Sequence, residues 1–123
     1  MRALVVDDSR AQRAFLKRML AGLGFDVVEA EDGHQALVQL QSAGPFDLAL
    51  VDWNMPVMTG IDFVRHARSG DGDAAMKVVM VTSETGMDRM SEALEAGADE
   101  YIMKPFSPEV LAQKLELIGL GTH

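Results

Sequence analysis

Five short apolar runs recur along the chain, and their spacing restricts the folds that the chain can adopt. The runs cover residues 3–6, 27–28 with their flanks, 48–51, 78–81 and 101–103. They are rich in β-branched residues and nearly continuous in apolar character, which is typical of strands buried on both faces of a parallel sheet. We therefore interpret them as five buried strands.

The segments between these runs have the periodicity of amphipathic helices, with apolar residues at spacings of three and four. They cover residues 11–23, 36–40 (ending near Gly44-Pro45), 61–67, 87–94 and a segment that begins at Ser107-Pro108. Gly97 is a natural left-handed stop for the fourth helix, and Ser107-Pro108 is a good N-cap and first turn for the fifth. The helical spacing assigns Phe15, Leu94 and Val110 to apolar faces.

Strands that alternate with helices predict an α/β fold, a doubly wound five-stranded parallel sheet with helices on both faces and right-handed crossovers. A length of 123 residues fits one domain, and we assign residues 1–120 to it and 121–123 to a short tail. No signal peptide or membrane span is visible, so we expect a cytoplasmic protein.

Net charge and cysteine content exclude several classes of partner and of site. Asp and Glu number 19 against 11 Lys and Arg, for a net charge of -8 that argues against nucleic acid and membrane partners. Cysteine is absent, which removes thiolate metal sites and cysteine nucleophiles.

Polar residues follow four of the five predicted strands at the point where each strand ends. Asp7 and Asp8 follow the first, Asp52 ends the third, Thr82 ends the fourth and Lys104 follows the fifth. The carboxyl ends of parallel strands meet at one edge of the sheet, where open α/β folds bind ligands. Each residue alone would more often be a turn or capping residue, but their combination in this order points to a site.

Three carboxylates at one edge repel one another unless a cation neutralises them. Oxygen ligands without His or Cys favour a hard ion, Mg²⁺ rather than Zn²⁺. Lys104 and the hydroxyl of Thr82 suit a phosphoryl group, so the set predicts phosphoryl transfer with one carboxylate as nucleophile.

With these residues in place, the chain resembles the receiver domain of two-component response regulators over nearly its whole length, and in particular the single-domain chemotaxis members. The resemblance rests on the following residues: Asp7-Asp8, Asp52-Trp53-Asn54-Met55-Pro56, Gly60, Thr82-Ser83-Glu84, Tyr101 and Lys104-Pro105-Phe106. It implies a flavodoxin-like sheet with strand order 2-1-3-4-5. It also implies a stand-alone switch in phosphorelay signalling that is not an enzyme acting on other molecules.

The family's residue roles transfer to matching positions here. Asp52 would be the phosphoacceptor and Lys104 would pair with the phosphoryl oxygens. Asp8 and Asp52 would ligate Mg²⁺ directly, Asp7 through water, and Asn54 through its backbone carbonyl. The Lys104-Pro105 peptide would be cis.

The resemblance also implies a switch and its partners. Thr82 would move toward the phosphoryl group, and Tyr101 would turn inward as the face formed by the fourth helix, fifth strand and fifth helix changes. Asn54 and Glu84 would modulate dephosphorylation. The phosphoryl donor would be a sensor histidine kinase or a histidine phosphotransfer protein. The downstream protein stays open, chemotactic or other, as does dimerisation of an otherwise monomeric protein upon phosphorylation.

Two alternative functions and one basic surface remain to be considered. A Mg²⁺-dependent phosphatase with an aspartyl nucleophile shares the residue types, but its usual Asp-x-Asp motif on the first strand is missing. A flavin carrier would need a Ser/Thr/Gly-rich phosphate loop where Asp7-Asp8 stands. The basic residues Arg10, Arg13, Lys17 and Arg18 form either a solvated helix face or a docking surface for the phosphoryl donor.

Overall fold

The computed structural model describes residues 1–53, 58–69, 76–82 and 87–120, with the side chains of residues 87–89 left out. Strands and helices alternate throughout. The elements are β1 (Arg2–Val6), α1 (Arg10–Gly22), β2 (Asp26–Ala30), α2 (Gly33–Ser42), β3 (Leu48–Asp52), α3 (Gly60–Arg68), β4 (Lys77–Thr82), α4 (Met87–Ala96), β5 (Glu100–Met103) and α5 (Pro108–Leu117).

The five strands form one parallel sheet in the order β2-β1-β3-β4-β5, which confirms the predicted fold. Along the chain, β2 is added on one side of β1 and β3 on the other side, so the direction in which strands are added reverses at β1. As a result β1 and β3 are neighbours, although a strand and two helices separate them in sequence. Ligands of doubly wound folds bind at such a reversal, beyond the carboxyl ends of the strands.

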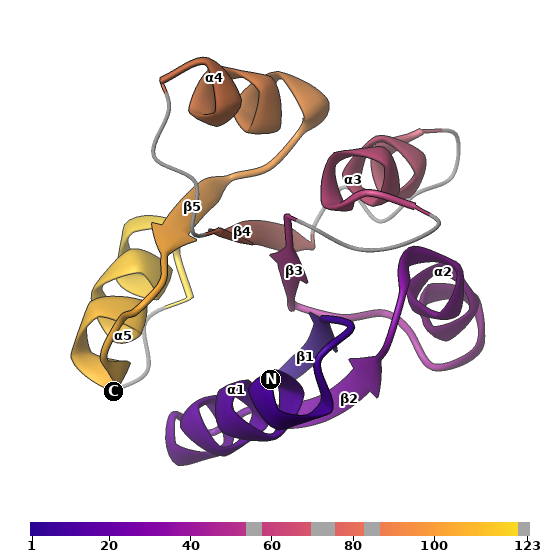
Figure 1. Ribbon diagram of the computed structural model, residues 1–123. Helices are drawn as coiled ribbons and strands as arrows, with labels where there is room; N and C mark the ends of the chain where they lie inside the picture. The colour runs from indigo at the N-terminus through magenta and orange to yellow at the C-terminus, as the bar shows by residue number, and fades with distance from the viewer. Residues whose placement is uncertain (54–57, 70–75, 83–86, 121–123) are drawn as a thin grey trace.

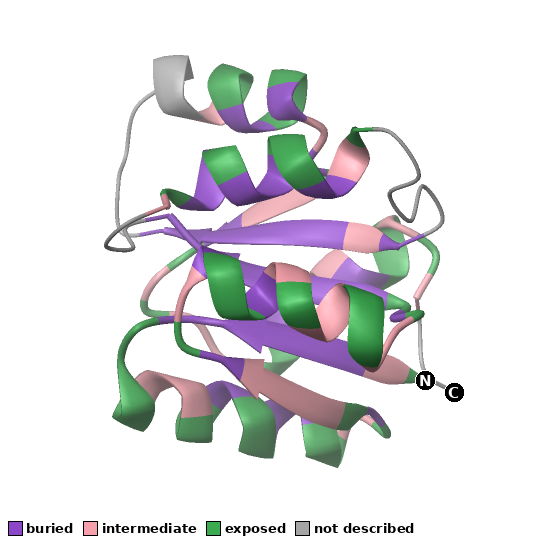
Figure 2. Ribbon diagram, turned by 90° about the vertical axis from the view of Figure 1, so that its right-hand side faces the viewer, coloured by how far each residue is buried: buried purple, intermediate pink, exposed green. Residues whose placement is uncertain are grey.

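Helices cover both faces of the sheet, α1 and α5 on one side and α2, α3 and α4 on the other (Figure 1). Each side has its own apolar core. The first core contains Leu16 and Leu20 of α1 with Leu111 of α5, and the second is centred on Phe63 of α3 and Met80 of β4. Figure 2 shows the strands as a largely buried layer between the helices. A sheet covered in this way holds the strand ends rigidly, which suits a site built there.

The two outer strands differ from the prediction that all strands are buried on both faces. The β2 residues Val27 and Val28 are only half-buried, and Met103 of β5 is exposed. An edge strand has a neighbour on one side only, so the helices cover it less completely. Phe15, Leu94 and Val110, which the helical spacing placed on apolar faces, are exposed, with exposed fractions of 47%, 49% and 39%. Each lies at the margin of its helix's apolar face, where three- and four-residue spacing does not distinguish buried from half-covered positions.

The predicted helix ends are confirmed at two positions. Ser107 caps α5 by accepting a hydrogen bond from the backbone nitrogen of Val110, and Pro108 is the first helical residue. Gly97 follows α4 with φ +117°, a left-handed conformation that favours glycine. In the described part of the chain, no helix is both long enough and apolar enough to cross a membrane.

Candidate functional site

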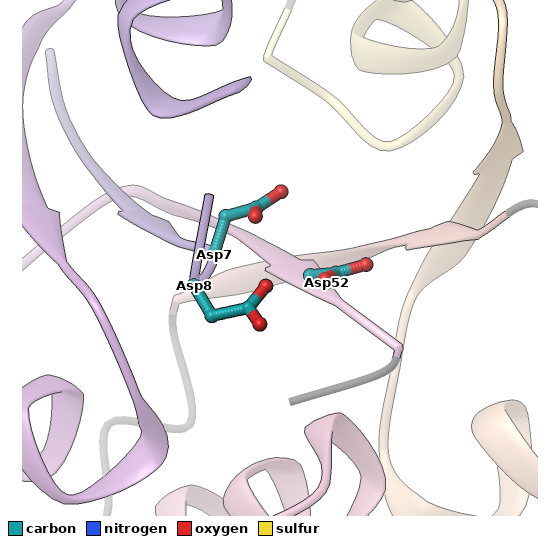
Figure 3. Close-up of side chains that lie close together, drawn as sticks. All are labelled: Asp7, Asp8 and Asp52. Carbon is teal, nitrogen blue, oxygen red and sulfur yellow. The ribbon is translucent and has the colours of Figure 1, made fainter. Parts of the chain in front are cut away.

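Three aspartates meet at the carboxyl edge of the sheet. One carboxylate oxygen from each of Asp7, Asp8 and Asp52 lies within 4.8 Å of the other two. Figure 3 shows Asp7 and Asp8 directly after β1, beside Asp52 at the end of β3. Asp7 and Asp52 are buried, with exposed fractions of 1% and 8%, and Asp8 is exposed. The structure thus brings together the three carboxylates that the sequence placed at one edge.

Backbone hydrogen bonds hold the two strand ends in place. The amide of Asp7 donates to the carbonyl of Ala30 at 3.1 Å, which extends the pairing of β1 with β2 by one residue. The amide of Trp53 donates to the carbonyl of Val81 at 3.0 Å, which does the same for β3 and β4. Asp7 and Asp52 therefore sit on backbone that the sheet itself fixes.

Lys104 supplies a cation at the same place. Its ammonium nitrogen donates to Oδ1 of Asp52 at 3.4 Å and lies 3.9 Å from Oδ2 of Asp7. The backbone of Lys104 is tied to β4, because its amide donates to the carbonyl of Thr82 at 2.8 Å. The Lys104-Pro105 peptide is cis, as the family resemblance implied.

Burial sets the electrostatics of the two inner carboxyls. It raises the pKa of Asp52 above its ordinary value of 3.8, and the neighbouring charge of Asp7 raises it further, while Lys104 opposes the shift. Burial also raises the pKa of Asp7, against the hydrogen bond from Ser9 and the positive charge of Lys104. One lysine therefore does not compensate the negative charge collected here.

The donor set fits a hard divalent cation. All three side chains offer carboxylate oxygens, the ligand type that Mg²⁺ prefers in proteins. Oδ2 of Asp7 is buried and accepts no hydrogen bond from any described residue. A buried carboxylate oxygen that accepts no hydrogen bond is costly, and the ammonium nitrogen of Lys104, at 3.9 Å, is too far away to donate one. The cluster can therefore hold a metal ion.

Thr82 lies on β4, the strand next to Asp52, and Tyr101 lies on β5, one strand further out. Thr82 ends β4 and is buried, with an exposed fraction of 5%. Tyr101 of β5 is half-buried, and the ammonium nitrogen of Lys114 on α5 lies 4.9 Å from the centre of its ring. Thr82 is thus at the site, whereas Tyr101 is linked to α5. Asn54 and Glu84, which the sequence singled out for dephosphorylation, lie outside the described residues.

Two residues shape the site in ways that the sequence reasoning missed. The side chain of Arg13, assigned to a solvated or docking face, contacts the backbone of Asp7, with Nη1 2.7 Å from its carbonyl oxygen. Gly60 begins α3 against the carbonyl of Asp52, where a Cβ atom would clash with that oxygen and lie 2.9 Å from Cε of Met80. Gly60 is one of the residues that carry the family resemblance, but only its close approach to the backbone of Asp52 explains why glycine is required there.

Comparison with known proteins identifies the family. Residues 3–116 match the sequence profile of the response regulator receiver domain. The chain belongs to that family. Receiver domains of this type accept a phosphoryl group from histidine kinases and act on protein targets.

Relatives of this receiver domain include chemotaxis regulators of similar length. It is 43% identical to the chemotaxis protein CheY1 of Helicobacter pylori over 124 residues, covering 100% of this chain and 99% of the relative. It is 44% identical to the chemotaxis protein CheY of Pseudomonas aeruginosa over 119 residues, covering 96% and 95% of the two chains. The receiver domain is therefore closely related to CheY regulators.

A solved structure agrees with both the fold and the relationship. The chemotaxis protein CheY4 of Vibrio cholerae superposes on this receiver domain with a TM-score of 0.88 and 36% identity, covering 95% of this chain and 97% of the other. The phosphatase and flavin-carrier alternatives are not favoured by these relationships.

Proposed function

We propose that this protein is a CheY-type response regulator that is phosphorylated on Asp52 and thereby controls a protein partner. The observation that carries the proposal is the position of Asp52. Its buried carboxylate lies 3.4 Å from a lysine ammonium group and within 4.8 Å of two further carboxylates. Membership of the receiver family supports the same assignment.

The metal ligands in this proposal are Asp7, Asp8 and Asp52, with the backbone carbonyl of Asn54 as a further oxygen donor. Asp8 and Asp52 would bind the ion directly, and Asp7 would act mainly through water. A bound Mg²⁺ supplies positive charge that offsets charge on the phosphoryl oxygens. Asp52 would then be both a metal ligand and the nucleophile.

Phosphorylation forms one bond and breaks one. A carboxylate oxygen of Asp52 attacks the phosphorus of a phosphohistidine, the P–N bond breaks, and the leaving imidazole takes up a proton. Lys104 contributes a positive charge to the phosphoryl oxygens, which it can reach because it already faces Asp52. Thr82 donates its hydroxyl hydrogen to a phosphoryl oxygen.

Dephosphorylation returns the carboxylate. Water attacks phosphorus in line with the bond to Asp52, that P–O bond breaks, and inorganic phosphate leaves. We assign Asn54 and Glu84 to the orientation of this water, on the resemblance alone. Replacing Glu84 with an apolar residue should change the rate of dephosphorylation, and an unchanged rate would contradict that assignment.

The switch depends on a group present in only one state. The phosphoryl group gives Thr82 an acceptor that the unmodified protein lacks, so the two states differ in their interactions there. As Thr82 shifts, Tyr101 turns inward and the surface of α4, β5 and α5 changes. Pro105 belongs to this unit because it joins Lys104 to the segment that leads into α5.

Membership of the receiver family also suggests the phosphoryl donor, the location and the partner of this protein. The donor is a sensor histidine kinase or a histidine phosphotransfer protein, and the protein acts in the cytoplasm as a monomer in its unmodified form. Residues 1–120 form the receiver domain. Similarity to chemotaxis regulators from three organisms favours a chemotactic partner.

The experiment that tests the proposal is exposure to a small-molecule phosphoryl donor such as acetyl phosphate. The wild-type chain and Asp52→Asn are compared with and without Mg²⁺, and Trp53 fluorescence follows the reaction. When the donor is added, we expect a Mg²⁺-dependent change in Trp53 fluorescence in the wild type and none in Asp52→Asn. Incorporation of phosphate that survives the substitution would refute the assignment. Repeated turnover of phosphate esters would instead favour the phosphatase alternative.

A further inference from the structure

Arg13 of α1 contacts two other parts of the molecule at once. It lies on α1, its Nη1 donates to the carbonyl oxygen of Asp7 at 2.7 Å, and its Nε donates to Oε1 of Glu29 on β2 at 3.3 Å. The exposed fraction of its side chain is only 13%. A long side chain held at both ends of its guanidinium fork is not a solvated surface charge.

The contact from Arg13 completes the set of hydrogen bonds that fixes Asp7. The amide of Asp7 donates to the carbonyl of Ala30 at 3.1 Å, and Oδ1 accepts from the amide of Ser9 at 2.8 Å. With the carbonyl oxygen held by Arg13, Oδ2 is the polar atom of Asp7 that accepts no hydrogen bond from the described residues. That oxygen is the one that faces Lys104, at 3.9 Å.

The same contact also bears on Asp8. The carbonyl of Asp7 and the amide of Asp8 belong to one planar peptide unit, so fixing the oxygen fixes the direction in which the chain leaves Asp7. Arg13 therefore acts on the backbone that presents both carboxylates. It contacts the carbonyl oxygen of Asp7 and not a carboxylate, and a guanidinium group offers no ligand atom to a metal ion.

Glu29 completes the arrangement. It binds Nε of Arg13 at 3.3 Å and lies 3.7 Å from the ammonium group of Lys17. A positive charge near a metal site repels the metal, and pairing with a carboxylate reduces that repulsion. Glu29 thus orients the guanidinium group and offsets its charge.

We propose that Arg13, oriented by Glu29, is a positioning residue for the metal-binding carboxylates of Asp7 and Asp8. This proposal rests on the proposed function, because it presumes that those carboxylates bind Mg²⁺. Residues that orient metal ligands typically change metal affinity by roughly 10- to 100-fold when they are replaced.

An effect through the charge of Arg13 and an effect through its position predict opposite changes in Mg²⁺ affinity, which makes the proposal testable. If Arg13 acted only through its charge, Arg13→Ala would remove a repulsive cation and tighten Mg²⁺ binding. If Arg13 positions the carboxylates, the same variant binds Mg²⁺ about tenfold more weakly or worse. Arg13→Lys keeps the charge but cannot hold both partners, so it should also weaken binding.

The experiment is a Mg²⁺ titration of the full chain, followed by Trp53 fluorescence and by calorimetry. The variants are Arg13→Ala, Arg13→Lys and Glu29→Gln. The control is Arg10→Ala, which removes an exposed arginine one turn earlier on α1. Urea unfolding of each metal-free variant separates a local change in affinity from a loss of folding.

Each outcome decides a different claim. Weakened Mg²⁺ binding in the Arg13 and Glu29 variants, with Arg10→Ala unchanged or slightly tighter, supports the proposal. Binding as tight as wild type in Arg13→Lys and Glu29→Gln overturns it and leaves the proposed function standing. A wild-type chain that binds no Mg²⁺ overturns both. If Arg13→Ala does not fold, Arg13→Lys carries the test, because loss of the Glu29 charge would weaken Mg²⁺ binding on electrostatic grounds as well.

Discussion

The ammonium nitrogen of Lys104 lies 3.4 Å from Oδ1 of Asp52. The same nitrogen lies 3.9 Å from Oδ2 of Asp7, so one cation faces two buried carboxylates, and Asp8 adds a third carboxylate at the rim. Negative charge is therefore in excess at the carboxyl edge of the metal-free sheet. This excess attracts a cation, and it also lowers the stability of the protein when no cation is bound.

Replacing Asp52 with asparagine should stabilise the metal-free protein. Burial and the charge of Asp7 raise the pKa of Asp52 in the folded state above its unfolded value, so the folded state binds the proton more tightly. The ionised carboxylate thus costs stability at neutral pH, and the cost disappears as pH falls through the raised pKa. We expect Asp52→Asn to gain on the order of 1 kcal/mol near pH 7, with the gain shrinking toward pH 4.

Urea unfolding in the presence of a chelator, repeated across this pH range, measures that gain. Mg²⁺ should reduce it, because the ion binds the folded wild type and stabilises it by mass action. An advantage for Asp52→Asn that does not change with pH would show that the buried charge is not its source.

Replacing Lys104 with methionine should separate metal binding from the phosphoryl response. The ammonium group repels a divalent cation, so its removal should leave Mg²⁺ affinity unchanged or increase it. The metal-free protein should lose stability, since two buried carboxylates lose their cation. Titration of Trp53 fluorescence, first with Mg²⁺ and then with a phosphoryl donor, measures the two responses. Loss of Mg²⁺ binding in Lys104→Met would place the lysine in a structural role.

Replacing Gly60 with alanine should damage the site from its backbone side. The added Cβ would collide with the carbonyl oxygen of Asp52, and backbone there cannot move without displacing the end of β3. We expect a loss of about 2 kcal/mol in stability and weaker Mg²⁺ binding. Gly22→Ala, on α1, is the matched control.

A Cβ at Gly22 meets no atom within 4 Å, so this substitution should be neutral or stabilising by up to about 1 kcal/mol. Urea unfolding and Mg²⁺ titration of both variants make the comparison. Equal behaviour of the two alanines would show that the approach of α3 to Asp52 is not tight in solution.

Replacing Lys114 with methionine should free the ring of Tyr101. The ammonium group lies 4.9 Å from the ring centre and 3.5 Å from Oε1 of Glu100, so it holds the ring in the position seen here. A cation–π contact at a partly exposed site is worth about 0.5–1 kcal/mol, which corresponds to a two- to fivefold shift between ring positions. Tyr101 is the single tyrosine of the chain, so selective isotope labelling resolves its NMR signal.

Lys114→Arg is the control, because it retains a cation that can stack on the ring. The shift should appear in Lys114→Met and be largely absent in Lys114→Arg. Identical Tyr101 signals in all three proteins would remove Lys114 from the account of the switch.

Much of this fold could be predicted because its periodic signals are strong and local. The five apolar runs became β1 to β5, and Ser107-Pro108 began α5 as expected. Phe15 and Val110 are exposed although they belong to apolar faces, because helical spacing identifies such a face but does not show where neighbouring helices stop covering it.

The site was predictable in part for a topological reason. Parallel strands bring their carboxyl ends to one edge, so Asp7, Asp8, Asp52 and Lys104 had to converge. Arg13 was misjudged because its position on α1 suggests solvent, and its partner Glu29 lies on β2, with no spacing rule that connects the two. Contacts between side chains on different elements depend on packing that the sequence pattern does not reveal.

The most direct measurement of the central claim locates the phosphoryl group. The wild-type chain is treated with acetyl phosphate and Mg²⁺, the acyl phosphate is reduced with borohydride, and the modified residue is identified by peptide mass spectrometry. The account predicts modification of Asp52, dependent on Mg²⁺ and absent in Asp52→Asn. Modification of Asp7 or Asp8 in its place, or no modification of the wild type under these conditions, would contradict it.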